Sequence, residues 1–170
     1  MEAPDRLWKA ITHVGPETSL ADIMTLADEV LDLVVPWVTR LGGLASILFK
    51  VAGDESGVSV YRVMKPGQDL VTWASAGRPG PITVTWGAPV SGLAIQEGAI
   101  QFVGSARALS TYFGGWLDVA ECIAVPLIRE RRGYGVLEAR SAAVGHIDLY
   151  TAEVVGEVAA RIAQSWPESE

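Results

Sequence analysis

A change in the spacing of apolar residues constrains the fold of this chain more than any other feature. Between residues 19 and 40 the apolar side chains recur at helical intervals, and from residue 44 to residue 86 the interval becomes two. The period-two runs are separated by short segments rich in Gly, Pro and Asp, which are typical of hairpin turns. These runs are residues 44–52, 58–64, 70–76 and 82–86. The pattern predicts a long helix that is capped by Ser19, kinked at Pro36 and ended by Gly42 and Gly43. Four antiparallel strands are expected to follow it.

The last of these runs also predicts which of its faces is buried. Ile82, Val84 and Trp86 alternate with two threonines. Because successive side chains of a strand point to opposite faces, we expect the three apolar residues to face the core.

The second half of the chain predicts two further strands and a closing helix. Residues 87–118 have a mixed pattern, with short helices expected near 91–96 and 106–113 and an extended piece at 100–103. Strands are expected at 120–129 and 133–141, and Thr151 is expected to cap an amphipathic helix. This order predicts an α+β fold. A single antiparallel sheet of about six strands would have the terminal helices on one face and short helices and loops on the other.

Length and composition favour one domain with one core. The chain has 170 residues, of which 49% are hydrophobic and 19% charged. We expect a lead-in helix in residues 1–18, the domain itself in 19–166 and a short tail in 167–170. The sequence contains neither an apolar run of the roughly 18 residues that span a membrane nor a signal-peptide pattern. It therefore predicts a soluble cytoplasmic protein.

The charge balance disfavours polyanionic partners. Thirteen basic residues against twenty acidic ones give a net charge of -7, whereas binding to phosphates needs a basic surface. We expect neither nucleic acid nor membrane as a partner. The basic group formed by Arg129, Arg131 and Arg132 is interpreted as a solvated hairpin tip, with an anion site as the alternative.

Several segments of the second half resemble the GAF domain family. Residues 120–128 (AECIAVPLI) and 133–141 (GYGVLEARS) are similar to the family's "VPL" and "GVL" strands on either side of a basic turn. Residues 150–153 (YTAE) are similar to its aromatic-Thr-x-Glu helix start. Residues 91–98 and 100–103 look like its short helix and the strand after it. The resemblance implies a sensory domain with a small-molecule pocket on the sheet face opposite the terminal helices.

A pocket of that kind would be lined by side chains of the strands and of the crossover at 87–118. The candidates are aromatic residues and one cysteine that fall in these segments, and for each of them ordinary core packing is the alternative. The candidate lining residues are Tyr61, Trp73, Trp86, Tyr112, Phe113, Trp116 and Cys122. The ligand and any cofactor stay unidentified at this stage.

The residues predict neither an enzyme nor a metal site. Cys122 is the single cysteine, whereas the methionine-sulfoxide reductases of the GAF family use several. One cysteine and two distant histidines are also too few for a metal site. No Ser-His-Asp arrangement or glycine-rich phosphate loop stands out. The prediction is therefore a non-enzymatic domain.

Two functions remain open. The first is a cytoplasmic sensory domain that binds a small molecule and signals through its terminal helices. The second is a module without a ligand that serves only to dimerise. Both allow a homodimer, because Leu31, Val35, Val158 and Ile162 could join a four-helix bundle across a two-fold axis.

Overall fold

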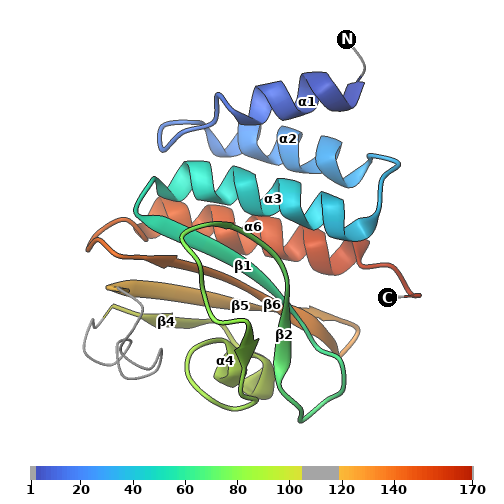
Figure 1. Ribbon diagram of the computed structural model, residues 1–170, viewed down its shortest axis with the longest axis vertical. Helices are drawn as coiled ribbons and strands as arrows, with labels where there is room; N and C mark the ends of the chain where they lie inside the picture. The colour runs from blue at the N-terminus through green and yellow to red at the C-terminus, as the bar shows by residue number, and fades with distance from the viewer. Residues whose placement is uncertain (1–2, 105–118, 170) are drawn as a thin grey trace.

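One antiparallel sheet organises the chain (Figure 1). The computed structural model describes residues 3–104 and 119–169. Within them the strand order is β3-β2-β1-β6-β5-β4, which confirms the α+β fold with a sheet of six strands. The strands are β1 (Ser56–Arg62), β2 (Leu70–Gly77), β3 (Thr83–Val84), β4 (Gln101–Val103), β5 (Glu121–Arg129) and β6 (Arg132–Ser141).

The long helices cover one face of this sheet and a short helix lies on the other (Figure 1). The long helices are α1 (Ala3–Ile11), α2 (Leu20–Leu31), α3 (Trp37–Ala52) and α6 (Leu149–Ser165), and the short one is α4 (Ser91–Glu97). Helices α3 and α6 pack directly on the strands, and α2 packs on both of them, with α1 outside it. None of the helices in the described ranges has both the length and the apolar character needed to cross a membrane.

The main core lies between the sheet and α3 and α6. Alternate residues of β1 and β5, such as Val58, Val60 and Ile123, face these helices and are buried there. Val158 and Ile162 of α6 are fully buried against them. These two side chains are therefore unavailable for the dimer bundle predicted from the sequence, because they already fill the core of their own subunit.

The segment predicted as the first strand, residues 44–52, is a helix instead. It forms the second half of α3, and the helix predicted over 19–40 ends at Leu31. Pro36 does not kink a helix but stands at the N-terminal cap of α3, where its missing N–H removes no helical hydrogen bond. Gly42 and Gly43 lie inside α3 rather than after a helix end.

Other strand predictions agree with the structure except at β3. The runs at 58–64, 70–76, 120–129 and 133–141 are confirmed as strands, and the extended piece at 100–103 is β4. The run at 82–86 shrinks to the two residues of β3, with Ile82 78% exposed and Val84 buried. The helix predicted at 106–113 lies outside the described residues.

Two helix caps can be compared with the sequence. Ser19 caps α2, because its side chain accepts a hydrogen bond from the backbone N–H of Asp22. At α6 the cap is Asp148, whose carboxylate accepts from the N–H of Thr151. The predicted cap Thr151 therefore lies inside the helix, as the residue that the true cap contacts.

Candidate functional site

A buried group of polar side chains lies on the sheet face that carries α4. In the strand register, Ser59 of β1 stands opposite Glu138 of β6, and Cys122 of β5 stands opposite Arg140. Tyr61 follows two residues after Ser59 and shares its face. The strands therefore bring a carboxylate, a guanidinium, a phenol, a hydroxyl and a thiol together under the short helix.

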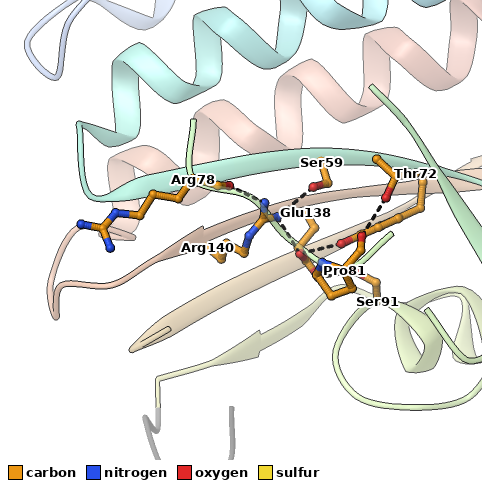
Figure 2. A network of polar contacts seen from close by, with 8 residues as sticks. Ser59, Thr72, Arg78, Pro81, Ser91, Glu138 and Arg140 are labelled. Carbon is orange, nitrogen blue, oxygen red and sulfur yellow. Dashed lines mark hydrogen bonds and ion pairs between the residues drawn. The ribbon is translucent and has the colours of Figure 1, made fainter. Parts of the chain in front are cut away.

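Glu138 is the centre of this polar cluster, and Figure 2 shows Ser91 and Arg140 directed toward it. Its carboxylate accepts hydrogen bonds from the hydroxyls of Tyr61 (3.1 Å) and Ser91 (2.8 Å). It also accepts one from Nη1 of Arg140 at 3.0 Å. Glu138 is 0% exposed. These three donors compensate a carboxylate that is shielded from water.

Arg140 is held from three sides and is only 2% exposed. Its Nη1 also donates to Oγ of Ser59 at 2.9 Å, and its Nη2 donates to the carbonyl oxygen of Arg78 at 2.8 Å (Figure 2). Its Nε is buried and has no hydrogen-bond partner in the part of the chain that the structure describes. One charged donor of the cluster is therefore unused.

The segment after β2 closes over Arg140. A Cβ added at Gly80 would lie 2.4 Å from the guanidinium carbon of Arg140, and one at Gly57 would lie 2.9 Å from its Nη2. Only glycine allows the backbone to approach the guanidinium so closely. The carbonyl of Pro81 in the same segment accepts a hydrogen bond from Thr72 at 2.8 Å. Residues 78–81 therefore form a fixed cover on this side of the cluster.

Burial raises the pKa of two groups that border Glu138, the Tyr61 phenol and the Cys122 thiol. The pKa of Tyr61 rises far above its ordinary value, first through loss of water and then through the negative charge of Glu138. The pKa of the Cys122 thiol rises for the same two reasons, and the opposing effect of Arg140 is smaller. Tyr61 is therefore a neutral hydrogen-bond donor, and Cys122 is held as a thiol rather than a thiolate.

The structure separates the pocket residues predicted from the sequence. Tyr61 belongs to the polar cluster and Cys122 borders it. Trp73 lies on the other face of the sheet, where the centroid of its ring is 5.5 Å from that of Trp166. A bulge opposite Val60 and Tyr61 leaves Trp73 without a partner on β1 and turns its side chain to this face. Trp73 thus packs against the helices and not in a pocket beneath α4. Tyr112, Phe113 and Trp116 lie outside the described residues.

The fourth described candidate, Trp86, lines an open cleft of about 580 Å³. This cleft lies where the last turn of α4 meets the turn between β5 and β6. Ile95 and Ile128 contribute apolar walls, and Arg131 and Arg132 contribute guanidinium groups. The cleft and the polar cluster are in contact with opposite ends of α4, because Ser91 begins this helix and Glu97 ends it.

Sequence reasoning missed the charged centre of the cluster. Glu138 and Arg140 were visible as charged residues at alternate positions of a strand that is otherwise apolar. Ser59 and Ser91 carried no comparable signal. Among the described residues, no three His, Cys, Asp or Glu side chains are grouped so that they could hold a metal ion.

Comparison with known proteins identifies the fold. No protein-family model and no curated protein matches the chain. Solved structures do match, and one is the GAF domain of an Acinetobacter phosphoenolpyruvate-protein phosphotransferase, with a TM-score of 0.71 and 16% identity over 86% of this chain and 89% of that one. The chain has a GAF-like fold.

Two further matches are enzymes. The free methionine-R-sulfoxide reductase of Neisseria meningitidis, solved in complex with its substrate, has a TM-score of 0.75 and 24% identity over 91% of this chain and 93% of that one. The corresponding protein of Staphylococcus aureus, also with substrate, has a TM-score of 0.75 and 17% identity over 88% and 97%. These reductases overturn the prediction that the chain is not an enzyme, because the GAF-like fold that it shares with them also carries catalysis.

Proposed function

We propose that this chain is a GAF-like domain that binds a small zwitterion of the amino-acid type at the polar cluster. The observation that carries the proposal is the buried pair of Glu138 and Arg140, whose Nε keeps an unused donor. Glu138 would accept the ammonium group of the ligand, and Arg140 would bind its carboxylate. In this structure the two side chains form an ion pair of 3.0 Å.

The energetics of the pair support a role beyond packing. Removing two charges from water costs several kcal/mol for each ion, and apolar side chains of similar volume often give a core of equal or greater stability. Groups with perturbed pKa values cluster at functional sites, and Tyr61 and Cys122 beside the pair both have raised pKa values. A pair that also leaves one buried N–H unused is therefore better explained by a ligand than by stability.

The solved structures support the same class of ligand. The Neisseria meningitidis protein was solved with its substrate, and its name gives that substrate as free methionine-R-sulfoxide, an amino-acid derivative. We choose this compound as the first ligand to test.

Reduction of methionine sulfoxide is a second candidate function, favoured by the fold shared with the reductases. Cys122 is the single thiol of the chain and lies beside Glu138. In the simplest cycle the sulfoxide oxygen passes to the Cys122 sulfur, which gives methionine and a sulfenic acid. Two equivalents of an external thiol then restore the Cys122 thiol, forming a disulfide and releasing water. The raised pKa of Cys122 predicts that such turnover is slow at neutral pH.

Signalling through α6 belongs to the first proposal, and one contact supports it. Nη1 of Arg129, on β5, donates to the carbonyl oxygens of Ala163, Gln164 and Trp166 at 2.9 to 3.2 Å. The end of α6 is thereby tied to the sheet that holds the cluster. We place this sensory domain in the cytoplasm as a homodimer, with an interface that excludes Val158 and Ile162 because both are buried within the subunit.

Calorimetric titration tests the binding proposal. The ligands are L-methionine-R-sulfoxide, L-methionine, N-acetylmethionine and methionine amide. N-acetylmethionine lacks the charged amine, and methionine amide lacks the carboxylate. We expect the zwitterions to bind and each blocked analogue to bind at least about tenfold more weakly, which corresponds to about 1.4 kcal/mol. If no zwitterion binds with a Kd below about 10 mM, or if blocking either charge has no effect, the proposal is wrong.

Matched serine variants locate the site. Ser91→Ala removes one hydrogen bond to Glu138, whereas Ser46→Ala removes a hydroxyl that donates to a helix carbonyl on the other face of the sheet. We expect only Ser91→Ala to weaken binding. A parallel assay of sulfoxide turnover with dithiothreitol, using Cys122→Ser as the control, tests the second candidate. Turnover that Cys122→Ser abolishes would establish it.

A further inference from the structure

The cleft beside the β5–β6 turn has no part in the proposed function, yet it has the size of a ligand site. Its volume of about 580 Å³ lies within the range of roughly 300 to 1,000 Å³ found for small-molecule pockets. Trp86 is half-buried in it, and Ile95 and Ile128 add apolar surface. These three side chains suit a flat apolar body.

Two cations stand at this apolar surface. Arg131 and Arg132 both line the cleft and both are exposed. Neither forms an ion pair with any residue that the structure describes; Arg131 has no hydrogen bond there either, and the guanidinium of Arg132 lies 4.8 Å from the ring of Tyr134. Among the described residues of the lining, the single carboxylate belongs to Glu97, which accepts a hydrogen bond from Gln101. The cleft therefore carries excess positive charge in a chain of net charge -7.

The backbone of the turn at Glu130 and Arg131 adopts a conformation that is unfavourable for residues other than glycine. Glu130 and Arg131 both have positive φ, at 51° and 67°. Two-residue turns of this type favour Asn-Gly, because other residues adopt the left-handed conformation only with strain. Glycine at position 131 would relieve the strain but would remove the guanidinium from the cleft. The presence of Arg131 at this strained position favours a role for its side chain in binding.

Close packing fixes the position of the apolar wall. A Cβ added at Gly133 would lie 2.7 Å from Cδ1 of Ile95. Glycine at this position lets α4 approach the start of β6, so that Ile95 lies directly beside the turn that carries the two arginines. The apolar surface and the cations are thus held at short range by the backbone.

We propose that this cleft is a second ligand site, for a small aromatic molecule that carries an oxyanion, either a carboxylate or a phosphate. Trp86 and the two isoleucines contact the ring, and Arg131 and Arg132 bind the anion. This inference goes beyond the proposed function, because it uses neither Glu138 nor Arg140 and names a different class of ligand.

The test uses the intact chain and four probes of similar size. Benzoate, phenylacetate and phenyl phosphate carry the anion, and benzyl alcohol is the neutral control. Binding is measured by calorimetry and by the NMR signal of the Trp86 indole N–H. We expect at least one anion to bind at least about tenfold more tightly than benzyl alcohol and to shift that signal. Comparison of phenyl phosphate with the carboxylates decides between the two oxyanions.

A charge-matched control separates the site from the overall charge of the protein. Arg131→Gln with Arg132→Gln removes both cations of the cleft, and Arg6→Gln with Arg161→Gln removes two charges elsewhere. Only the first pair is expected to weaken anion binding about tenfold or more. Equal binding of benzyl alcohol, equal effects of the two pairs, or no binding of any anion with a Kd below about 10 mM would each overturn the proposal. Ser91→Ala alters the polar cluster but not the lining of this cleft, so this variant is expected to bind the anions as the unaltered protein does. Its titration distinguishes failure of this proposal from failure of the proposed function.

Discussion

Glu138 and Arg140 stand two residues apart on the same face of β6 and form an ion pair of 3.0 Å with both side chains buried. Residues two apart on a strand share one face, and charged residues at such positions are normally exposed to solvent. Here α4 and residues 78–81 cover that face. The α4 face therefore holds a carboxylate and a guanidinium that are both shielded from water. Its consequences can be measured without knowledge of the ligand.

Replacing Glu138 by Gln is expected to lower the free energy of unfolding by about 3 to 5 kcal/mol, because the charge of Arg140 stays buried without its partner. Urea denaturation measures the change. The double variant Glu138→Leu with Arg140→Met removes both charges and is expected to recover most of the loss. A loss below about 1 kcal/mol for Glu138→Gln would show that the pair is not the buried ion pair described.

Stability is expected to fall steeply at alkaline pH. The pKa values of Cys122 and Tyr61 are raised in the folded protein above their ordinary values of 9.0 and 10.0. The unfolded chain therefore loses these protons first, and the stability present below pH 9 is lost as the pH rises. Each group contributes a slope of about 1.4 kcal/mol per pH unit above its ordinary pKa.

Two variants separate these contributions when unfolding is followed in urea from pH 8 to pH 11, about the range in which both groups titrate when unfolded. Cys122→Ala should flatten the curve from about pH 9 upward, and Tyr61→Phe from about pH 10 upward. An unchanged slope in Tyr61→Phe would contradict the burial of that hydroxyl.

Arg129→Gln is expected to loosen the end of α6. The variant removes a charged donor from three carbonyl oxygens, with an expected cost of about 1 to 3 kcal/mol. Urea denaturation gives the loss, and hydrogen exchange should quicken in the last turn of α6. Arg161→Gln is the control, since its ion pairs with Asp28 and Glu157 are partly exposed and contribute at most about 1 kcal/mol. Equal losses in the two variants would contradict the capping role of Arg129.

Adjacent glycines of α3 are expected to respond in opposite directions to alanine. A Cβ at Gly43 would lie 2.6 Å from the ring of Trp8, so Gly43→Ala must displace this ring, which packs α1 on α3, and should cost about 1 to 3 kcal/mol. Gly42 has no neighbour within 4 Å of such a Cβ, and Gly42→Ala should stabilise the helix by about 0.5 to 1 kcal/mol. Thermal unfolding of both variants decides, and a stabilising Gly43→Ala would contradict the packing of α1 on α3.

The sequence was sufficient to predict the sheet but not every element that builds it. The strands at 120–129 and 133–141 were predictable because two short runs rich in apolar residues flank a short charged turn. The error at residues 44–52 arose because Gly42 and Gly43 were interpreted as a helix end. When the segment is instead taken from Trp37, its buried residues Leu41, Leu44, Leu48 and Val51 show helical spacing.

The candidate site was only partly predictable, for a physical reason. Alternation shows which strand residues share a face, but not whether that face is covered by a second layer. Glu138 and Arg140 have the pattern of solvated residues, and among the described segments α4 and residues 78–81 cover them. Trp73 was predicted to line the pocket, but a one-residue bulge moves a side chain to the other face of the sheet. No residue type in β2 indicates that bulge in the sequence.

Helix α4 spans both proposed sites, since Ser91 at its start contacts Glu138 and Glu97 at its end lines the cleft. This helix has seven residues and is about 10 Å long, so the two proposed sites lie within one short element. A ligand at one end that moves α4 therefore changes the free energy of binding at the other. If both proposed ligands bind and either one moves α4, thermodynamic reciprocity requires the anion and the zwitterion to alter each other's affinity by the same factor. The proposed domain would then respond to two compounds in combination.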